Sequence, residues 1–130
     1  MPRKKADITK AAISLKDVAA GKKAPLHLFP AAGIIYGALA CKEGARKYGP
    51  YNWREKPISL VQHLSALRRH ILAALDGQWR DPDGADLPHL AKVVATAAII
   101  LDANSVGKLI DDLPPRGKAA EILDKYEVKK

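Results

Sequence analysis

The sequence predicts an all-α fold, a single-domain bundle of four to five helices. Apolar residues recur every three or four positions in several long stretches, which is the spacing of an amphipathic helix. Glycine and proline clusters separate these stretches, and no segment shows the alternating pattern of a half-buried strand. A chain of 130 residues has the size of one domain, so we expect a single domain over residues 1–130. Its ends, residues 1–7 and 128–130, are expected to be flexible.

The first two helices are bounded by breaker residues. Helical spacing of apolar residues predicts a first helix over residues 8–20, closed by Gly21. An alanine-rich stretch predicts a second helix over residues 31–48, because Gly49 and Pro50 follow it directly.

The third helix has the clearest pattern. Leu60, Leu64, Leu67, Ile71 and Leu75 are spaced by three or four residues, which places them on one face. An eleven-residue acidic loop, QWRDPDGADLP, follows. A fourth helix is expected to start at the end of this loop, with a core stripe that includes Leu90 and Leu101, and a short last helix is expected over residues 117–128.

The charge distribution suggests an anionic partner. The net charge is +8, with +5 in residues 1–30, +5 in residues 31–80 and −2 in residues 81–130. Nucleic acid, free nucleotides and phosphate-rich metabolites all fit such an imbalance, and so does a charge that serves solubility alone.

The sequence favours a cytoplasmic protein. Cys41 is the single cysteine, so no intramolecular disulfide can form and a reducing compartment suits the chain. Its apolar neighbours indicate a buried, inert thiol. The longest apolar stretch contains Lys92 and is shorter than the ~20 residues that span a bilayer. The basic amino terminus is not followed by the apolar run of a signal peptide, so no membrane partner is expected.

Two polar segments are candidates for binding an anion. The segment KYGPYNWREK, residues 47–56, gathers tyrosines, a tryptophan and cations around a Gly-Pro break. Lys47 and Arg54 can contact phosphate, and Tyr48 or Trp53 can stack on a base. Arg69, in the third helix, can bind phosphate with its planar guanidinium group, or it can pair with a carboxylate of the acidic loop.

A third group of residues has the chemistry of a metal site. If the third and fourth helices pack antiparallel, His89 and the loop aspartates Asp81 and Asp83 come close together, with His70 about two turns down the third helix. Oxygen and imidazole donors suggest Mg²⁺ or Mn²⁺, and no cysteine cluster is present for structural zinc. The histidines can equally be core or boundary residues. An EF-hand is rejected because Lys92 stands where the closing glutamate belongs.

Two stretches of the sequence carry a family resemblance. In order, GARKYGPYNWRE and LSALRRHILAALDGQWRDPDGADLPHLA resemble small phage-encoded proteins of the dATP/dGTP diphosphohydrolase family, or their amino-terminal domain. The match covers residues 44–91. The resemblance implies an all-α nucleotide pyrophosphohydrolase, akin to MazG-like enzymes, that uses Mg²⁺ to cleave a purine deoxynucleoside triphosphate to monophosphate and pyrophosphate. The matching positions are Lys47, Tyr48, Asn52, Trp53, Arg69, His70, Asp81, Asp83 and His89.

The sequence also departs from the family pattern. Gln78 stands where the family usually has glutamate, and Lys92 stands where a second histidine often occurs. The paired carboxylate motifs that hold metal on the helices of MazG-like enzymes do not occur here. These differences favour a protein that binds nucleotides without hydrolysing them.

On the family resemblance, the first functional hypothesis is a metal-dependent nucleoside triphosphate diphosphohydrolase in the host-cell cytoplasm. His70, Asp81 and His89 are the candidate catalytic residues, and Asp81, Asp83 and His89 are the candidate ligands of Mg²⁺ or Mn²⁺. The candidate substrate-binding residues are Lys47, Tyr48, Asn52, Trp53, Arg54 and Arg69.

Two other functions stay open. One is a non-catalytic nucleotide-binding protein that acts as a sponge or regulator. The other, less favoured, is a basic nucleic-acid-binding accessory protein, because an acidic loop between helices is hostile to a phosphate backbone. A homo-oligomer is expected, with Ala91, Ala95 and Ala98 as an exposed alanine face.

Overall fold

A computed structural model describes residues 12–83 and 85–129. The chain divides into two units, Met1–Ala31 and Ala32–Lys130. The elements of the first unit are helix α1, Leu15–Ala20, and the short 3-10 helix η1, Leu26–Leu28. The expectation of a single domain stays a prediction.

Helix α1 is shorter than the sequence predicts. It begins at Leu15 because the side chain of Ser14 caps it, accepting a hydrogen bond from the backbone N–H of Asp17 at 3.0 Å. Residues 12–14, which the sequence places within this helix, are not helical, so this part of the prediction is wrong. The rest of that helix, residues 8–11, lies outside the described residues, as do the expected flexible residues 1–7 and Lys130.

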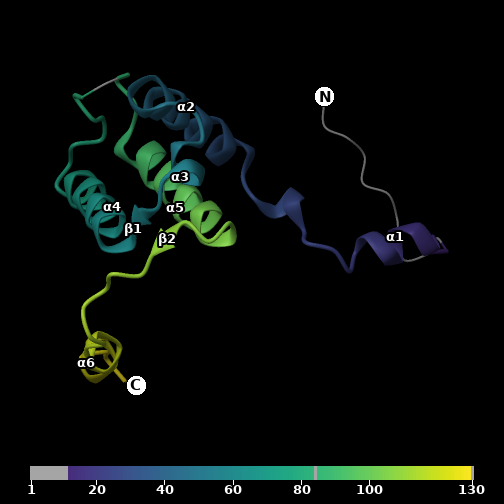
Figure 1. Cartoon of the computed structure of the whole chain (residues 1–130). Coiled ribbons are helices and arrows are strands. Elements are labelled where there is room, and N and C mark those ends of the chain that lie inside the picture. The colour runs from purple at the N-terminus through teal and green to yellow at the C-terminus, as the bar shows by residue number, and fades with distance from the viewer. Residues whose placement is uncertain (1–11, 84, 130) are drawn as a thin grey trace. The chain divides into compact units, whose positions relative to one another are not determined.

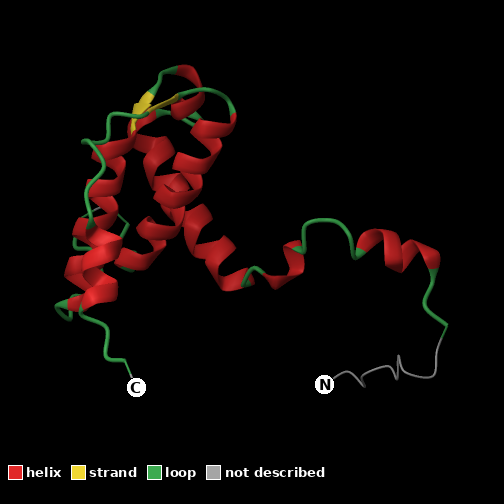
Figure 2. Cartoon of the chain, turned by 90° about the horizontal axis from the view of Figure 1, so that it is seen from below, coloured by secondary structure: helices red, strands yellow, loops and turns green. Residues whose placement is uncertain are grey.

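The second unit consists mainly of helices, which confirms the all-α prediction (Figures 1 and 2). Its elements are α2 (Ala31–Tyr48), α3 (Asn52–Glu55), β1 (Ile58–Ser59), α4 (Leu60–Leu75), α5 (His89–Ser105), β2 (Leu109–Ile110) and α6 (Ala119–Lys125). Helix α2 has the predicted bounds, and α4 spans the predicted apolar stripe from Leu60 to Leu75. Helix α3 and both strands are not predicted, because segments of two to four residues are too short to show a period.

The two strands connect the end of α5 to the start of α4. They pair in parallel, with Ile58 opposite Leu109 and Ser59 opposite Ile110. Just beyond β2, Asp112 accepts hydrogen bonds from the Ser59 hydroxyl group and, at 2.8 Å, from the backbone N–H of Val61. A carboxylate therefore caps the amino terminus of α4, where free N–H groups favour a negative charge.

The core between α2 and α5 is built from small residues. Ala91 and Ala95 are buried together with Ala40 and Leu87. At Gly37 a Cβ atom would lie 3.1 Å from Val94 Cγ1, so glycine permits the close approach of the two helices at this point. The expectation that Ala91 and Ala95 are exposed is wrong, because these residues form the packing face of α5 against the core. The homo-oligomer itself stays a prediction.

The segment between α2 and α4 is held by one carboxylate of α5. Asp102 accepts a hydrogen bond from Trp53 Nε1 at 2.6 Å and two from Arg54, at 2.7 Å and 2.9 Å. Tyr51 adopts a left-handed backbone with φ of 55°, and the Arg54 guanidinium group lies 4.7 Å from the centre of its ring. These contacts fix the short helix α3 against α5.

This arrangement predicts a specific acid sensitivity. The hydrogen bonds from Arg54, and then from Trp53, lower the pKa of Asp102 to about 2. Because the folded pKa is depressed, the stabilisation is present above the ordinary pKa of about 3.8 and is lost as the pH falls towards 2. We expect Asp102→Asn to lower the melting temperature at neutral pH and to flatten the loss of stability between pH 4 and 2. Thermal unfolding of both proteins across this range checks the prediction, and parallel curves would contradict it.

Candidate functional site

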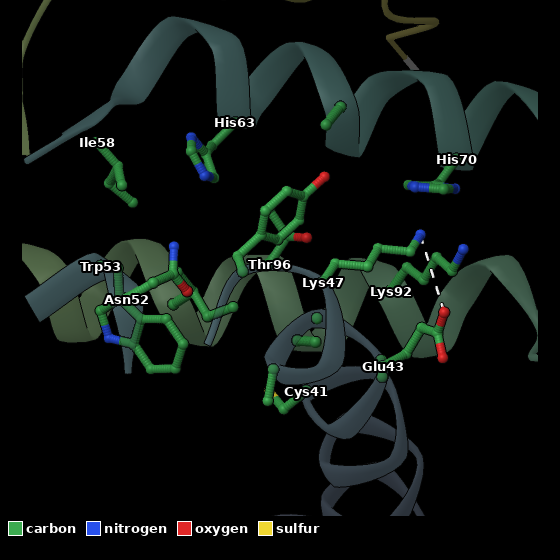
Figure 3. Close-up of a pocket in the computed structure, with 17 residues that line it drawn as sticks. Cys41, Glu43, Lys47, Asn52, Trp53, Ile58, His63, His70, Lys92 and Thr96 are labelled. Carbon is green, nitrogen blue, oxygen red and sulfur yellow. Dashed lines mark ion pairs between the residues drawn. The ribbon is translucent and has the colours of Figure 1, made fainter. Parts of the chain in front are cut away.

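A cavity of about 310 Å³ lies between α2, α4 and α5, with α3 and β1 at one end (Figure 3). Its volume is at the lower end of the range for small-molecule sites, ~300–1,000 Å³. The residues that line it are Ala40, Cys41, Glu43, Gly44, Ala45, Lys47, Tyr48, Asn52, Trp53, Ile58, His63, Ala66, His70, Lys92, Ala95, Thr96 and Ile99.

The centre of the cavity is rich in nitrogen donors. Lys47 from α2 and Lys92 from α5 extend into the same space, and His63 and His70 face it from α4 (Figure 3). Among its lining residues, Glu43 provides the one carboxylate. An excess of basic groups in a partly enclosed space favours an anionic ligand.

Glu43 is already paired with cations of its own helix. Arg46 Nη2 lies 2.5 Å from Glu43 Oε1, and Lys47 Nζ lies 3.9 Å from the same oxygen. The hydrogen bond from Arg46 is the main reason why the pKa of Glu43 is lowered. Glu43 is therefore ionised at neutral pH, but its charge is largely compensated.

The end of the cavity formed by α3 and β1 is aromatic. Trp53 and Tyr48 line it together with Asn52 and Ile58. The indole ring cannot turn freely, since its N–H is bound to Asp102 at 2.6 Å. A fixed ring beside an amide side chain is suited to stacking on a heterocyclic base and hydrogen bonding to its edge.

A buried polar group adjoins the cavity at the other end of α4. Its members are His70 of α4, Asp81 of the acidic loop and His89, the first residue of α5. Backbone hydrogen bonds hold the loop in place, from Asp81 N–H to Leu87 O at 2.9 Å and from His89 N–H to Trp79 O at 3.0 Å. The antiparallel packing of α4 and α5 thus places His89 beside Asp81, as the sequence predicts. It also brings His70 into contact with His89.

The two imidazole rings form a directed chain of hydrogen bonds. His89 Nε2 lies 2.8 Å from Gln78 Oε1, and because that oxygen can only accept, the imidazole N–H donates. The Nδ1 atoms of His70 and His89 face each other at 2.8 Å. In the neutral pair, His89 Nδ1 accepts the proton of His70 Nδ1, which leaves the lone pair of His70 on Nε2. Burial lowers the pKa of His70, so this ring is neutral at pH 7.

Asp81 is the buried anion of the group. Its side chain is 7% exposed, and Lys92 Nζ lies 2.5 Å from its Oδ2. Its Oδ1 accepts the backbone N–H of Asp83 at 2.9 Å. Burial by itself would raise the pKa of Asp81, but the hydrogen bonds from Lys92 and from the Asp83 backbone outweigh it and the pKa is lowered. Asp81 is therefore ionised at neutral pH.

The donor atoms of this group fit a divalent transition-metal ion. Asp81 Oδ2 lies 3.8 Å from His70 Nδ1 and 3.9 Å from His89 Nδ1, so the three potential ligand atoms surround one point. Two imidazole nitrogens and one carboxylate oxygen suit Mn²⁺ better than Mg²⁺, which prefers oxygen ligands throughout. Gln78 would orient His89 from behind, as outer-shell partners do in metal sites.

The structure brings together most of the residues that the sequence singles out. The cavity is lined by Lys47, Tyr48, Asn52, Trp53 and His70, and Asp81 and His89 form with His70 the polar group that adjoins it.

Three of the predicted residues lie elsewhere. Arg54 is bound to Asp102 outside the cavity. Arg69 is exposed and donates to Ser65 Oγ at 3.3 Å, instead of contacting the acidic loop. The exposed Asp83 contributes its backbone N–H to Asp81, and its carboxylate is outside the group with His70 and His89.

Several residues of the site, among them Lys92, His63 and Cys41, are not among the candidate site residues of the sequence. Lys92 is a charged residue within an apolar stretch, one turn after His89. A charge at such a position can indicate a functional residue, but the sequence does not show which function it has. His63 shares a helix face with His70, and its Nδ1 lies 2.8 Å from Ser59 O. Cys41 lines the cavity, and burial raises the pKa of its thiol.

Comparison with known proteins gives one family. A family model described as dATP/dGTP diphosphohydrolase, N-terminal, matches residues 14–113. Searches among curated proteins and among solved structures find no match. Within residues 12–83 and 85–129, no helix combines the length and the apolar character that crossing a membrane requires.

Proposed function

Because the chain belongs to the dATP/dGTP diphosphohydrolase N-terminal family, we propose that it binds a purine deoxynucleoside triphosphate and hydrolyses it to monophosphate and pyrophosphate. The observation that carries the proposal is the combination of a cationic centre and an aromatic end in one cavity. A nucleotide has the same two parts, a polyanion and a planar base.

Different lining residues contact the phosphates and the base of the nucleotide. Lys47 and Lys92 contact the phosphate oxygens through charge-assisted hydrogen bonds. Trp53 stacks on the base, an interaction worth ~1–3 kcal/mol. The amide of Asn52 faces the same space and hydrogen-bonds to the base or sugar.

The reaction needs a proton acceptor next to the phosphates. The oxygen of a water molecule attacks phosphorus, the bond between the α-phosphorus and the bridging oxygen breaks, and pyrophosphate leaves with that oxygen. His70 Nε2, which carries the lone pair in the hydrogen-bonded chain of His70, His89 and Gln78, accepts the proton of the water. The ammonium groups of Lys47 and Lys92 stabilise the charge that develops on the phosphate oxygens.

If a divalent ion takes part, His70, Asp81 and His89 would hold it. Ligation by His70 Nδ1 would place the imidazole proton on Nε2, so His70 would then be a ligand and not the proton acceptor. Such an ion polarises phosphate oxygens and makes a bound water more acidic. We favour Mn²⁺ over Mg²⁺ because two of the three donors are imidazole nitrogens.

Lys47 offers a direct test of the binding mode. We expect Lys47→Met to weaken binding of dATP or dGTP about tenfold or more, because it removes a charged hydrogen bond to phosphate. Isothermal titration calorimetry at constant salt measures the change. Lys42→Met is the matched control, since Lys42 lies on the same helix, is exposed and does not line the cavity. Equal affinities of the two variants would contradict the proposed phosphate site.

A second candidate function is a nucleotide-binding protein without turnover. The contact of Lys92 with Asp81 favours it, because the carboxylate nearest the cavity histidines is already neutralised. Calorimetry with and without EDTA, combined with product analysis, separates the two functions. Tight binding that persists in EDTA and leaves the nucleotide intact supports the second one.

A further inference from the structure

Lys92 contacts the buried carboxylate at the atom that a metal ion would need. Its Nζ lies 2.5 Å from Asp81 Oδ2, and this same oxygen is the one that lies 3.8 Å from His70 Nδ1 and 3.9 Å from His89 Nδ1. The lysine side chain is 17% exposed, so the ion pair is shielded from water on most sides.

The other oxygen of Asp81 is also engaged. Oδ1 accepts the backbone N–H of Asp83 at 2.9 Å, which orients the carboxylate. The backbone carbonyl of Asp83 also accepts from Lys92 Nζ at 3.2 Å, so the loop holds the ammonium group through two acceptors. The position of Lys92 is therefore determined by the loop and not only by a flexible side chain.

We propose that Lys92 is the resident cation of the group formed by His70, Asp81 and His89, and that it lowers the affinity of this group for divalent metal ions. A dication that binds Asp81 Oδ2 must displace the ammonium group or share the oxygen with it, and the two like charges repel each other strongly in a buried site. The negative charge of Asp81 is balanced without a metal. The residues are those of the proposed nucleotide site, but the inference concerns metal affinity and is tested without nucleotide.

The test compares Mn²⁺ binding to the full chain and its variants by calorimetry at pH 7.5. The wild type is expected to bind Mn²⁺ weakly. Lys92→Met, which keeps the length of the side chain and removes its charge, is expected to bind Mn²⁺ about tenfold more tightly or better. The double variant with Asp81→Asn is expected to lose this gain, because the carboxylate ligand is gone. Lys42→Met is the control, a lysine of α2 that is exposed and does not line the cavity.

Thermal unfolding with and without Mn²⁺ gives an independent readout. In Lys92→Met the buried carboxylate has no cation, so Mn²⁺ is expected to raise its melting temperature more than that of the wild type. A Lys92→Met protein that folds only with Mn²⁺ gives the same answer, and Lys92→Gln repeats the comparison with a polar side chain. The proposal is overturned if the wild type binds Mn²⁺ as tightly as Lys92→Met and Lys92→Gln do. It is also overturned if Mn²⁺ raises the melting temperatures of the wild type, Lys92→Met and Lys92→Gln equally.

Discussion

Replacing Asp81 with Asn is expected to lower the free energy of unfolding by about 3 kcal/mol, since it leaves the ammonium group of Lys92 without its buried partner. The asparagine side chain keeps the size of aspartate and can still accept the backbone N–H of Asp83. The loss therefore reports the charge of Asp81 and not its shape. Urea unfolding at pH 7, followed by circular dichroism, measures it.

The matched control is Asp83→Asn in the same loop. Asp83 is exposed, and its contribution to the group is a backbone N–H that the substitution retains. We expect this variant to stay within ~0.5 kcal/mol of the wild type. If both variants lose the same amount of stability, the buried ion pair between Asp81 and Lys92 is not what holds the acidic loop.

Replacing His70 with Asn is expected to reduce the rate of nucleotide hydrolysis by about 10²–10⁴-fold, the usual contribution of a general base. It removes the Nε2 lone pair that faces the cavity. Lys47 and Trp53 remain in place, so the affinity for dATP or dGTP is expected to change much less than the rate. Steady-state rates of pyrophosphate release and calorimetric affinities together distinguish lost chemistry from lost binding.

His27→Asn controls for an unspecific effect of losing an imidazole group. His27 is exposed in η1, in the other unit of the chain. Its variant should hydrolyse nucleotide at the rate of the wild type. A His70→Asn protein that retains the full rate would remove His70 from the mechanism, whereas a parallel loss of rate and affinity would assign it a structural role.

The long helices could be predicted because their sequences obey one period over several turns. In α4 the spacing of leucine and isoleucine fits a helix and no other secondary structure. Gly77, with φ of 94°, lies in the turn just after the helix. The limits of α1 and α3 depend instead on single hydrogen bonds. Ser14 fixes the start of α1, and Asp102, about fifty residues away in sequence, holds α3. A local pattern contains no information on such distant contacts.

In the site, too, some features follow from local sequence patterns and others depend on distant contacts. Antiparallel packing of two adjacent helices is enough to predict that Asp81 and His89 lie near each other, but the direct contact of His70 with His89 is not predicted. The partner of each cation depends on side-chain geometry, however. Arg54 is bound by Asp102 and Arg69 by Ser65, so neither reaches the cavity. Lys92, which is not among the predicted site residues, instead lies in the site and contacts Asp81.

The buried alanines illustrate a limit of composition. Small residues on a helix suit either a subunit interface or a close contact within one subunit. Ala91 and Ala95 serve the second purpose, because α2 approaches α5 closely at Gly37. Only the arrangement of the helices decides between the two.

Quantifying the products formed from dATP and dGTP tests the central proposal most directly. Purified protein is incubated with each nucleotide, once with Mn²⁺ and once with EDTA, and the mixture is resolved by ion-exchange chromatography. The proposed function predicts monophosphate and pyrophosphate in equal amounts, at a rate that falls in His70→Asn. Intact nucleotide under both conditions, with binding still detected by calorimetry, would contradict hydrolysis and leave a nucleotide-binding protein.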